Sequence, residues 1–236
     1  MKILVTGSKG FVGKNLVAEL RNKGYKEIFE FDVDTDKSLL DEYTEQCNFV
    51  FHLAGVNRPK DEKEFMEGNF GFTSELLELL KKHNNKAPVL ITSSIQAERD
   101  NPYGKSKKAA EDLIFKYGQE NSVKVLVYRL PNLFGKWSRP NYNSVVATFC
   151  YNIARDLEIQ IHDPNNELTL CYIDDVVKEF ISALEGKETR DGIFCKVPKT
   201  YKIKLGELAE KLYSFRNSRG NLVMPSLENE FDRALY

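Results

Sequence analysis

Residues 2–13, Lys2-Ile-Leu-Val-Thr-Gly-Ser-Lys-Gly-Phe-Val-Gly13, decide the fold, because an apolar strand runs directly into spaced glycines and then into a helical pattern. The first glycine permits a tight turn, the second lets the backbone approach a pyrophosphate, and the third lets the helix pack closely on the strand. Unpaired N–H groups at the start of a helix bind phosphate. The stretch therefore predicts a dinucleotide site formed by Gly7, Ser8, Lys9, Gly10, Phe11, Val12 and Gly13.

Short apolar runs alternate with helical patterns through the first 130 residues. The runs lie at 2–5, 27–33, 48–53, 88–92 and 123–129. Such alternation builds a parallel sheet wrapped by helices. The runs at 89–92 and 125–128 are continuously apolar, as expected of central strands covered on both faces. We therefore expect an α/β fold, a Rossmann doubly wound parallel sheet.

The pattern changes near residue 131, where a long polar and aromatic loop interrupts the alternation. Beyond it we expect helices near 143–155, 174–185 and 204–214, with strands near 157–162 and 193–197. These elements predict one domain over residues 1–216, with a nucleotide-binding core at about 1–130 and a small C-terminal substrate-binding lobe at about 131–216. The polar stretch 217–236 is expected to be a linker or the truncated start of a further domain.

Composition limits the classes of partner. The net charge of −1 leaves no basic field for nucleic acid, and the absence of any run of eighteen apolar residues argues against membrane insertion. No signal-peptide pattern opens the chain, so a cytoplasmic location is expected. The four cysteines lie far apart and histidines number three, which predicts reduced thiols and no metal site.

Tyr103 and Lys107 lie four residues apart, which places a phenol and an ammonium group on one face of a helix. A nearby positive charge favours the phenolate and suits the pair to proton transfer. Chance alone would produce about one such pair in this chain, so the context matters. Ser94 ends an apolar strand nearby and could polarise a carbonyl oxygen; alternatively, Ser93 and Ser94 satisfy backbone groups at the strand end.

Taken together, these residues carry a family resemblance. The pattern comprises the glycine motif 6–13, His52-Leu-Ala-Gly55, Asn69, Ser94, Tyr103-x-x-x-Lys107 and Arg129-x-x-Asn132. The chain resembles the extended short-chain dehydrogenase/reductases over about residues 1–185. Within them, the segments 128–137 and 170–175 resemble bacterial capsular-polysaccharide reductases that act on UDP-linked 4-keto-6-deoxy amino sugars. Those enzymes usually carry a C-terminal cupin domain, which this chain would lack.

The resemblance implies NADPH-dependent reduction of the C4 keto group of a UDP-4-keto-6-deoxy-N-acetylhexosamine, in the N-acetyl-L-fucosamine pathway of capsule synthesis. Tyr103 would protonate the sugar oxygen, Lys107 would lower the tyrosine pKa and bind the nicotinamide ribose, and Ser94 would orient the carbonyl. Further cofactor contacts would come from Asp32, Leu53, Ala54, Gly55, Asn69, Thr92, Leu130 and Pro131. Asn132 would contact the sugar nucleotide, with Arg139 a candidate for its pyrophosphate. The resemblance also implies a homodimer formed through helices around 70–82 and 103–118.

Several alternatives remain open from the residues. Asp32 could accept a hydrogen bond from a ribose hydroxyl, which favours NAD, whereas Lys9 resembles the basic residues that hold a 2′-phosphate, which favours NADPH. A UDP-sugar C4 epimerase would share Ser94, Tyr103 and Lys107, and a non-catalytic NADP sensor could keep the glycine motif alone. His52 is expected to be a packed core residue, and His83 a solvated helix end.

Overall fold

The computed structural model describes residues 1–236 and divides them into two compact units. The first comprises Met1–Leu130 with Val177–Val197, and the second comprises Pro131–Val176 with Pro198–Tyr236. The first unit contains a seven-stranded sheet in the order β2-β1-β3-β4-β5-β9-β8. Its strands are β1 (Lys2–Thr6), β2 (Glu27–Phe31), β3 (Phe49–His52), β4 (Val89–Ser94), β5 (Val125–Leu130), β8 (Arg190–Asp191) and β9 (Phe194–Cys195).

The sheet is doubly wound. Strands β1 to β5 pair in parallel, and β9 continues parallel to β5, whereas β8 closes the edge antiparallel to β9. Strand β2 lies on one side of β1, and β3 to β5 follow on the other. The direction in which successive strands are added to the sheet therefore reverses between β1 and β3. Ligands of open α/β sheets bind at the carboxyl ends of the strands beside such a reversal. The expected α/β fold with a parallel sheet is confirmed.

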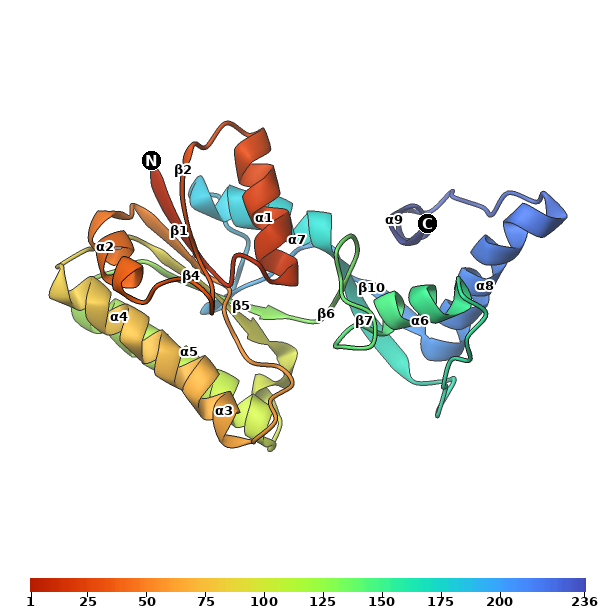
Figure 1. Cartoon of the computed structure of the whole chain (residues 1–236), viewed down its shortest axis with the longest axis horizontal. Helices are drawn as coiled ribbons and strands as arrows, with labels where there is room; N and C mark the ends of the chain where they lie inside the picture. Colours follow the sequence, from red (N-terminus) through yellow and green to blue (C-terminus); the bar gives the residue numbers. More distant parts are fainter. The chain divides into compact units, whose positions relative to one another are not determined.

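Helices cover both faces of this sheet (Figure 1). One face carries α2 (Ser38–Gln46), α4 (Phe72–Lys82) and α5 (Pro102–Asn121), whose buried side chains join the strands in one apolar core. The other carries α1 (Phe11–Asn22) and the later part of α7 (Ile173–Leu184). Burial on both faces explains why β4 and β5 are continuously apolar rather than alternating.

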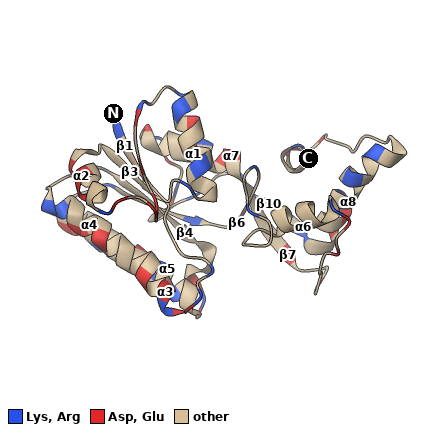
Figure 2. Ribbon diagram, in the orientation of Figure 1, with Lys and Arg blue, Asp and Glu red and all other residues tan.

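The leucine-rich helix α4 packs inward, because Leu76, Leu77 and Leu80 are buried in the core and Leu79 packs against it. Its outer face is polar. Basic and acidic residues are interspersed along α4 and α5 (Figure 2), with pairs such as Lys81–Glu78 and Lys108–Asp112. These two helices therefore present no continuous basic stripe.

The second unit has its own three-stranded sheet, in the order β10-β7-β6. Its strands are β6 (Asn132–Phe134), β7 (Glu167–Tyr172) and β10 (Tyr201–Lys204), and its helices are α6 (Val145–Ile153), α8 (Leu205–Asn221) and α9 (Glu230–Leu235). The predicted strand at 157–162 is wrong, and β7 occupies residues 167–172 instead. Ile159 and Ile161 pack half-buried against the core, so their alternation reflects packing without a partner strand.

The first unit is interrupted after Leu130 and takes up the chain again at Val177. Residues 177–197 return to the first unit, so the lobe is not one continuous segment. Residues 217–221 continue α8, and α9 follows, its Phe231 ring 5.9 Å from the Phe134 ring and 5.0 Å from the Tyr201 ring. The C-terminal stretch therefore contributes side chains to the core of the second unit.

The cysteines are free thiols, of which Cys47, Cys171 and Cys195 are buried and Cys150 is exposed. No helix has the length and apolar character needed to cross a bilayer.

A buried histidine connects three segments of the first unit. His52 Nδ1 lies 2.8 Å from the Thr6 hydroxyl and its Nε2 lies 2.9 Å from the Thr73 hydroxyl. Because the Thr73 hydroxyl donates to the Asn69 carbonyl, it accepts from Nε2–H, which leaves Nδ1 to accept from Thr6. Burial, with a smaller contribution from Lys107, lowers the pKa of His52 to about 3. His52 is thus the packed core residue that the sequence predicted.

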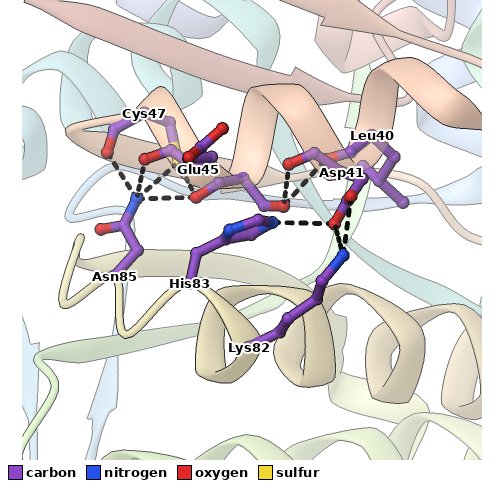
Figure 3. A network of polar contacts seen from close by, with 8 residues as sticks. Leu40, Asp41, Glu45, Cys47, Lys82, His83 and Asn85 are labelled. Carbon is purple, nitrogen blue, oxygen red and sulfur yellow. Dashed lines mark hydrogen bonds and ion pairs between the residues drawn. The ribbon is translucent and has the colours of Figure 1, made fainter.

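A second polar network joins α2 to the turn after α4 (Figure 3). The Asn85 amide donates to the carbonyls of Thr44 at 2.7 Å and Cys47 at 2.9 Å, and its oxygen accepts from Ala87 N at 2.8 Å. His83 Nε2 lies 2.8 Å from an Asp41 carboxylate oxygen, and the His83 side chain is only 16% exposed. His83 does end its helix, but it pairs with Asp41 instead of being solvated as predicted.

Replacing His52 should reduce the loss of stability in acid. In the unfolded chain His52 is protonated below its ordinary pKa of about 6.5, whereas in the folded protein it stays neutral down to about pH 3. The unfolding free energy therefore falls as the pH drops through this window. Between pH 7 and pH 5, wild type should lose about 2 kcal/mol more unfolding free energy than His52→Gln. Urea denaturation at both pH values measures the difference, and equal losses would contradict the neutral assignment.

Asn85→Ala should destabilise the first unit, because three backbone groups would lose their partner. The expected loss is about 1–3 kcal/mol of unfolding free energy, measured by urea denaturation. The control is Asn22→Ala, whose exposed amide contacts Glu19 on the surface of α1, and its change should stay within about 0.5 kcal/mol. Equal effects of the two substitutions would show that the Asn85 contacts add nothing.

Candidate active site

The glycine loop between β1 and α1 has no room for side chains at two of its positions. Gly7 has a φ of +69°, and a Cβ there would lie 2.7 Å from Ala54 N. A Cβ at Gly13 would lie 2.1 Å from the carbonyl oxygen of Gly7. The tight turn and the close helix packing predicted for these glycines are therefore present.

The start of α1 offers unpaired donors. Gly10 is the N-cap and supplies no side-chain cap, and the first turn contains no acidic residue. The Ser8 hydroxyl is buried without a hydrogen-bond partner, although buried polar atoms normally have one. A pyrophosphate would supply oxygen acceptors to this hydroxyl and to the first amides of the helix. The residues present therefore fit the phosphates of a dinucleotide.

The end of β2 brings Lys9 together with two aspartates. One oxygen of Asp32 accepts from the Lys9 backbone N–H at 2.7 Å and the other from Val33 N–H at 2.9 Å. The Lys9 ammonium pairs with the exposed carboxylate of Asp34, a hydrogen bond that raises the pKa of Lys9 and lowers that of Asp34. Asp32, which would favour NAD, and Lys9, which would favour NADP, thus lie together at the glycine loop.

Ser94 and Tyr103 meet at the carboxyl end of β4. Helix α5 begins at Pro102, capped by the Asn101 side chain, which accepts from Gly104 N–H at 2.7 Å. This start places Tyr103 in the first turn, where its hydroxyl forms a hydrogen bond with Ser94. The Ser94 hydroxyl also accepts from Gln96 N–H at 3.2 Å, so it caps the short helix η2 (Ile95–Glu98) as well as facing the phenol.

Lys107 lies one turn further along α5 and is nearly enclosed. Its Nζ donates to the Thr92 carbonyl at 3.3 Å and lies 6.0 Å from the centre of the Tyr103 ring. Burial lowers the pKa of Lys107 to about 8, and the charge of Glu111 opposes this. Burial raises the pKa of Tyr103, which the Ser94 hydrogen bond opposes. Tyr103 is therefore protonated at neutral pH, because burial of the phenol outweighs the opposing hydrogen bond from Ser94.

Asn69 and Gly55 fix the surroundings of Lys107. Asn69 is buried in the π-helical turn η1 (Met66–Gly71); its amide oxygen accepts from Val56 N–H at 3.0 Å and its nitrogen donates to the Ser106 hydroxyl at 2.9 Å. A Cβ at Gly55 would lie 2.9 Å from both the Asn69 amide oxygen and Lys107 Nζ. The segment after β3, Leu53 to Gly55, therefore runs directly beside the lysine.

A buried carboxylate and its half-buried arginine partner near this site were not among the residues singled out for chemistry. Glu111 is fully buried on α5 and pairs with Arg129 at the end of β5. The sequence pattern marked Arg129 only as part of the Arg129-x-x-Asn132 motif and did not mark Glu111. The spacing of four residues between Lys107 and Glu111 was the signal available in the sequence.

The remaining predicted positions follow β5. Thr92 and Leu130 belong to the first unit, whereas Pro131, Asn132 and Arg139 belong to the second. Within the second unit Asn132 begins β6 and is exposed, and the Arg139 guanidinium lies 5.4 Å from the centre of the Tyr142 ring. Binding roles for these three residues stay predictions.

Comparison with known proteins gives consistent relatives. Over all 236 residues the chain is 49% identical to UDP-2-acetamido-2,6-beta-L-arabino-hexul-4-ose reductase of Pseudomonas aeruginosa, covering 63% of that protein. It matches the crystal structure of the capsular polysaccharide assembling protein CapF from Staphylococcus aureus with a TM-score of 0.92 and 47% identity, covering 100% of this chain and 64% of that one.

The chain thus spans less than two thirds of the length of either relative. A more distant structure, UDP-glucuronic acid 4-epimerase from Bacillus cereus in complex with NAD, shares the fold with a TM-score of 0.80 at 21% identity, covering 92% of this chain and 83% of that one. Residues 3–194 match the NAD dependent epimerase/dehydratase family. The chain belongs to that family.

Proposed function

We propose that the chain carries the reductase site of an enzyme that reduces the C4 keto group of a UDP-4-keto-6-deoxy-N-acetylhexosamine with NADPH, in the synthesis of a capsular polysaccharide precursor. The observation that carries the proposal is the contact between the Ser94 and Tyr103 hydroxyls with the buried Lys107 one helical turn away. An identity of 49% to a hexul-4-ose reductase, over all of this chain and 63% of that protein, supports the choice of substrate. We further infer that the precursor serves N-acetyl-L-fucosamine synthesis.

The chemistry divides between cofactor and protein. When bound, the nicotinamide supplies a hydride to the sugar C4. Tyr103 donates its proton to the oxygen that becomes the C4 hydroxyl, and Ser94 donates a hydrogen bond to the same oxygen. The raised pKa of Tyr103 keeps this proton in place beforehand. The Lys107 ammonium stabilises the phenolate that proton transfer leaves behind.

The choice of NADPH over NAD rests on Lys9. Both oxygens of Asp32 already accept backbone N–H groups, and the Lys9 ammonium lies beside this strand end, where a cation would favour a 2′-phosphate. Asn132 and Arg139 complete the proposal as contacts of the sugar nucleotide. Dimerisation through the helices at 70–82 and 103–118, and a cytoplasmic location, stay predictions from the sequence.

The direct test mixes the purified chain with NADPH or NADH and adds the UDP-4-keto-6-deoxy-N-acetylhexosamine, while the absorbance of the reduced nicotinamide is followed. Consumption of NADPH that depends strictly on the keto sugar is the expected result. Absence of consumption with either cofactor, despite demonstrated cofactor binding, would contradict a reductase. Tight retention of NAD through purification would instead indicate an epimerase.

Tyr103→Phe should abolish turnover and leave cofactor binding nearly intact. The substitution removes the proton donor without removing the ring, so kcat should fall by at least about 100-fold. The NADPH dissociation constant, measured by nicotinamide fluorescence, should change less than about threefold. Tyr213→Phe, at an exposed position of α8, is the matched control and should retain full activity. Equal kcat for the two variants would contradict the role of Tyr103.

Lys9→Ala should weaken NADPH selectively. Loss of a charged contact to phosphate should raise the KM for NADPH by about tenfold or more while the KM for NADH changes little. Lys23→Ala, an exposed lysine after the end of α1, controls for the change in net charge. If both cofactors weaken equally, Lys9 does not select the 2′-phosphate.

A further inference from the structure

A fully buried carboxylate lies on the same helix as Tyr103 and Lys107. Glu111 is 0% exposed and belongs to α5, the helix that carries Tyr103 and Lys107. One of its oxygens accepts from the Ser93 hydroxyl at 2.6 Å and from Arg129 Nε at 2.9 Å. The other accepts from the second guanidinium branch at 2.7 Å. The carboxylate is therefore held in one orientation by a bidentate arginine and a serine.

Its partners come from the two strands that end beside the site. Ser93 and Arg129 are register partners in the β4–β5 pair, and Ser93 directly precedes Ser94. The Arg129 guanidinium lies 4.0 Å from the centre of the Phe194 ring and donates to Glu98 at 2.5 Å. Glu111 thus ties the helix of Tyr103 and Lys107 to the strand end that presents Ser94.

The same carboxylate acts on the charge of Lys107. Lys107 faces Tyr103 and Glu111 on its own helix; from β3 it faces His52, which is uncharged at neutral pH. Beyond Glu111 lies the Arg129 guanidinium from β5, itself paired with Glu98 from η2. Asn69, from η1, brings no charge. Glu111 is accordingly the one negative group among these that opposes the effect of burial on Lys107.

We propose that Glu111 is a positioning residue for the reaction, which holds α5 against the Ser93–Ser94 strand end and keeps the Lys107 ammonium charged through its buried contacts with Ser93 and Arg129. The inference rests on the proposed function for its kinetic consequence. Buried ion pairs contribute little to stability compared with apolar residues of the same shape, so stability alone gives no strong reason for this one.

The test compares Glu111→Gln with wild type over pH 6 to 9.5, using NADPH and the keto sugar. Glutamine keeps the shape and removes the negative charge nearest Lys107, so that Glu98 becomes the one carboxylate paired with Arg129. We expect kcat to fall by about tenfold or more and the alkaline limb of the pH profile to move down by about one pH unit, with a KM for NADPH within about threefold of wild type. Glu120→Gln, exposed on the same helix, is the control.

A second substitution separates position from charge and covers the case in which Glu111→Gln does not fold. Ser93→Ala removes one hydrogen bond and keeps the Glu111 charge, so kcat should fall by about threefold to tenfold with the alkaline limb unmoved. If Glu111→Gln folds and keeps the wild-type pH profile, the inference is wrong while the proposed function stands. If Glu111→Gln does not fold, a kcat of Ser93→Ala equal to that of wild type overturns the inference about Glu111.

If wild type itself consumes no NADPH, the proposed function is contradicted but the role of Glu111 is not decided. A further measurement then tests that role. The Lys107 ammonium is then titrated by NMR in protein with 13C-labelled lysine, assigned with Lys107→Arg. A pKa of Lys107 lowered by about one unit in Glu111→Gln supports the inference. An unchanged titration overturns it.

Discussion

The first turn of α1 lies so close to the end of β1 that neither Gly7 nor Gly13 has room for a Cβ. A Cβ at Gly13 would lie 2.1 Å from the Gly7 carbonyl oxygen, and one at Gly7 would meet the segment after β3. This approach aims the start of α1 at the carboxyl edge of the sheet and brings Ala54 beside the loop. One residue further on, a Cβ at Gly55 would lie 2.9 Å from Lys107 Nζ. The absence of side chains at these glycines thus brings the glycine loop and Lys107 to one edge of the sheet.

Buried hydrogen bonds then hold this edge together across segments that are distant in sequence. Thr6 binds His52, His52 binds Thr73, and the Thr73 hydroxyl donates to the Asn69 carbonyl. The Asn69 amide continues to Ser106, which donates to the Tyr103 carbonyl. Since a buried polar group without a partner costs about 1–3 kcal/mol, each link constrains the next. Strand β1 is connected in this way to the turn that presents Tyr103.

The sequence predicted those parts of the structure that depend on local pattern. Continuous apolar runs located β4 and β5 because both faces of a central parallel strand are buried, and the glycine spacing located the loop after β1. It failed at 157–162, where alternating isoleucines pack without a partner strand, and at α9, a short polar helix whose place depends on Phe231 reaching Phe134. Spacing gave Tyr103 and Lys107 but not Glu111, because its significance lies in contacts with Ser93 and Arg129. Such contacts follow from strand register, which a local pattern does not contain.

Burial acts in opposite directions on Tyr103 and Lys107, and in the proposed reaction this sets the conditions under which the site can work. It raises the pKa of Tyr103 and so preserves the proton that a reduction needs, but it lowers the pKa of Lys107 to about 8 and so threatens the charge that the phenolate needs. A site that excluded water more completely would hold the Tyr103 proton more firmly, but it would lower the pKa of Lys107 further and favour loss of its charge. A buried negative charge one turn from the lysine relieves this conflict, because it stabilises the ammonium without hydrating the phenol. Since Arg129 and Ser93 hold that charge at a fixed place, the site can remain enclosed while its lysine stays protonated.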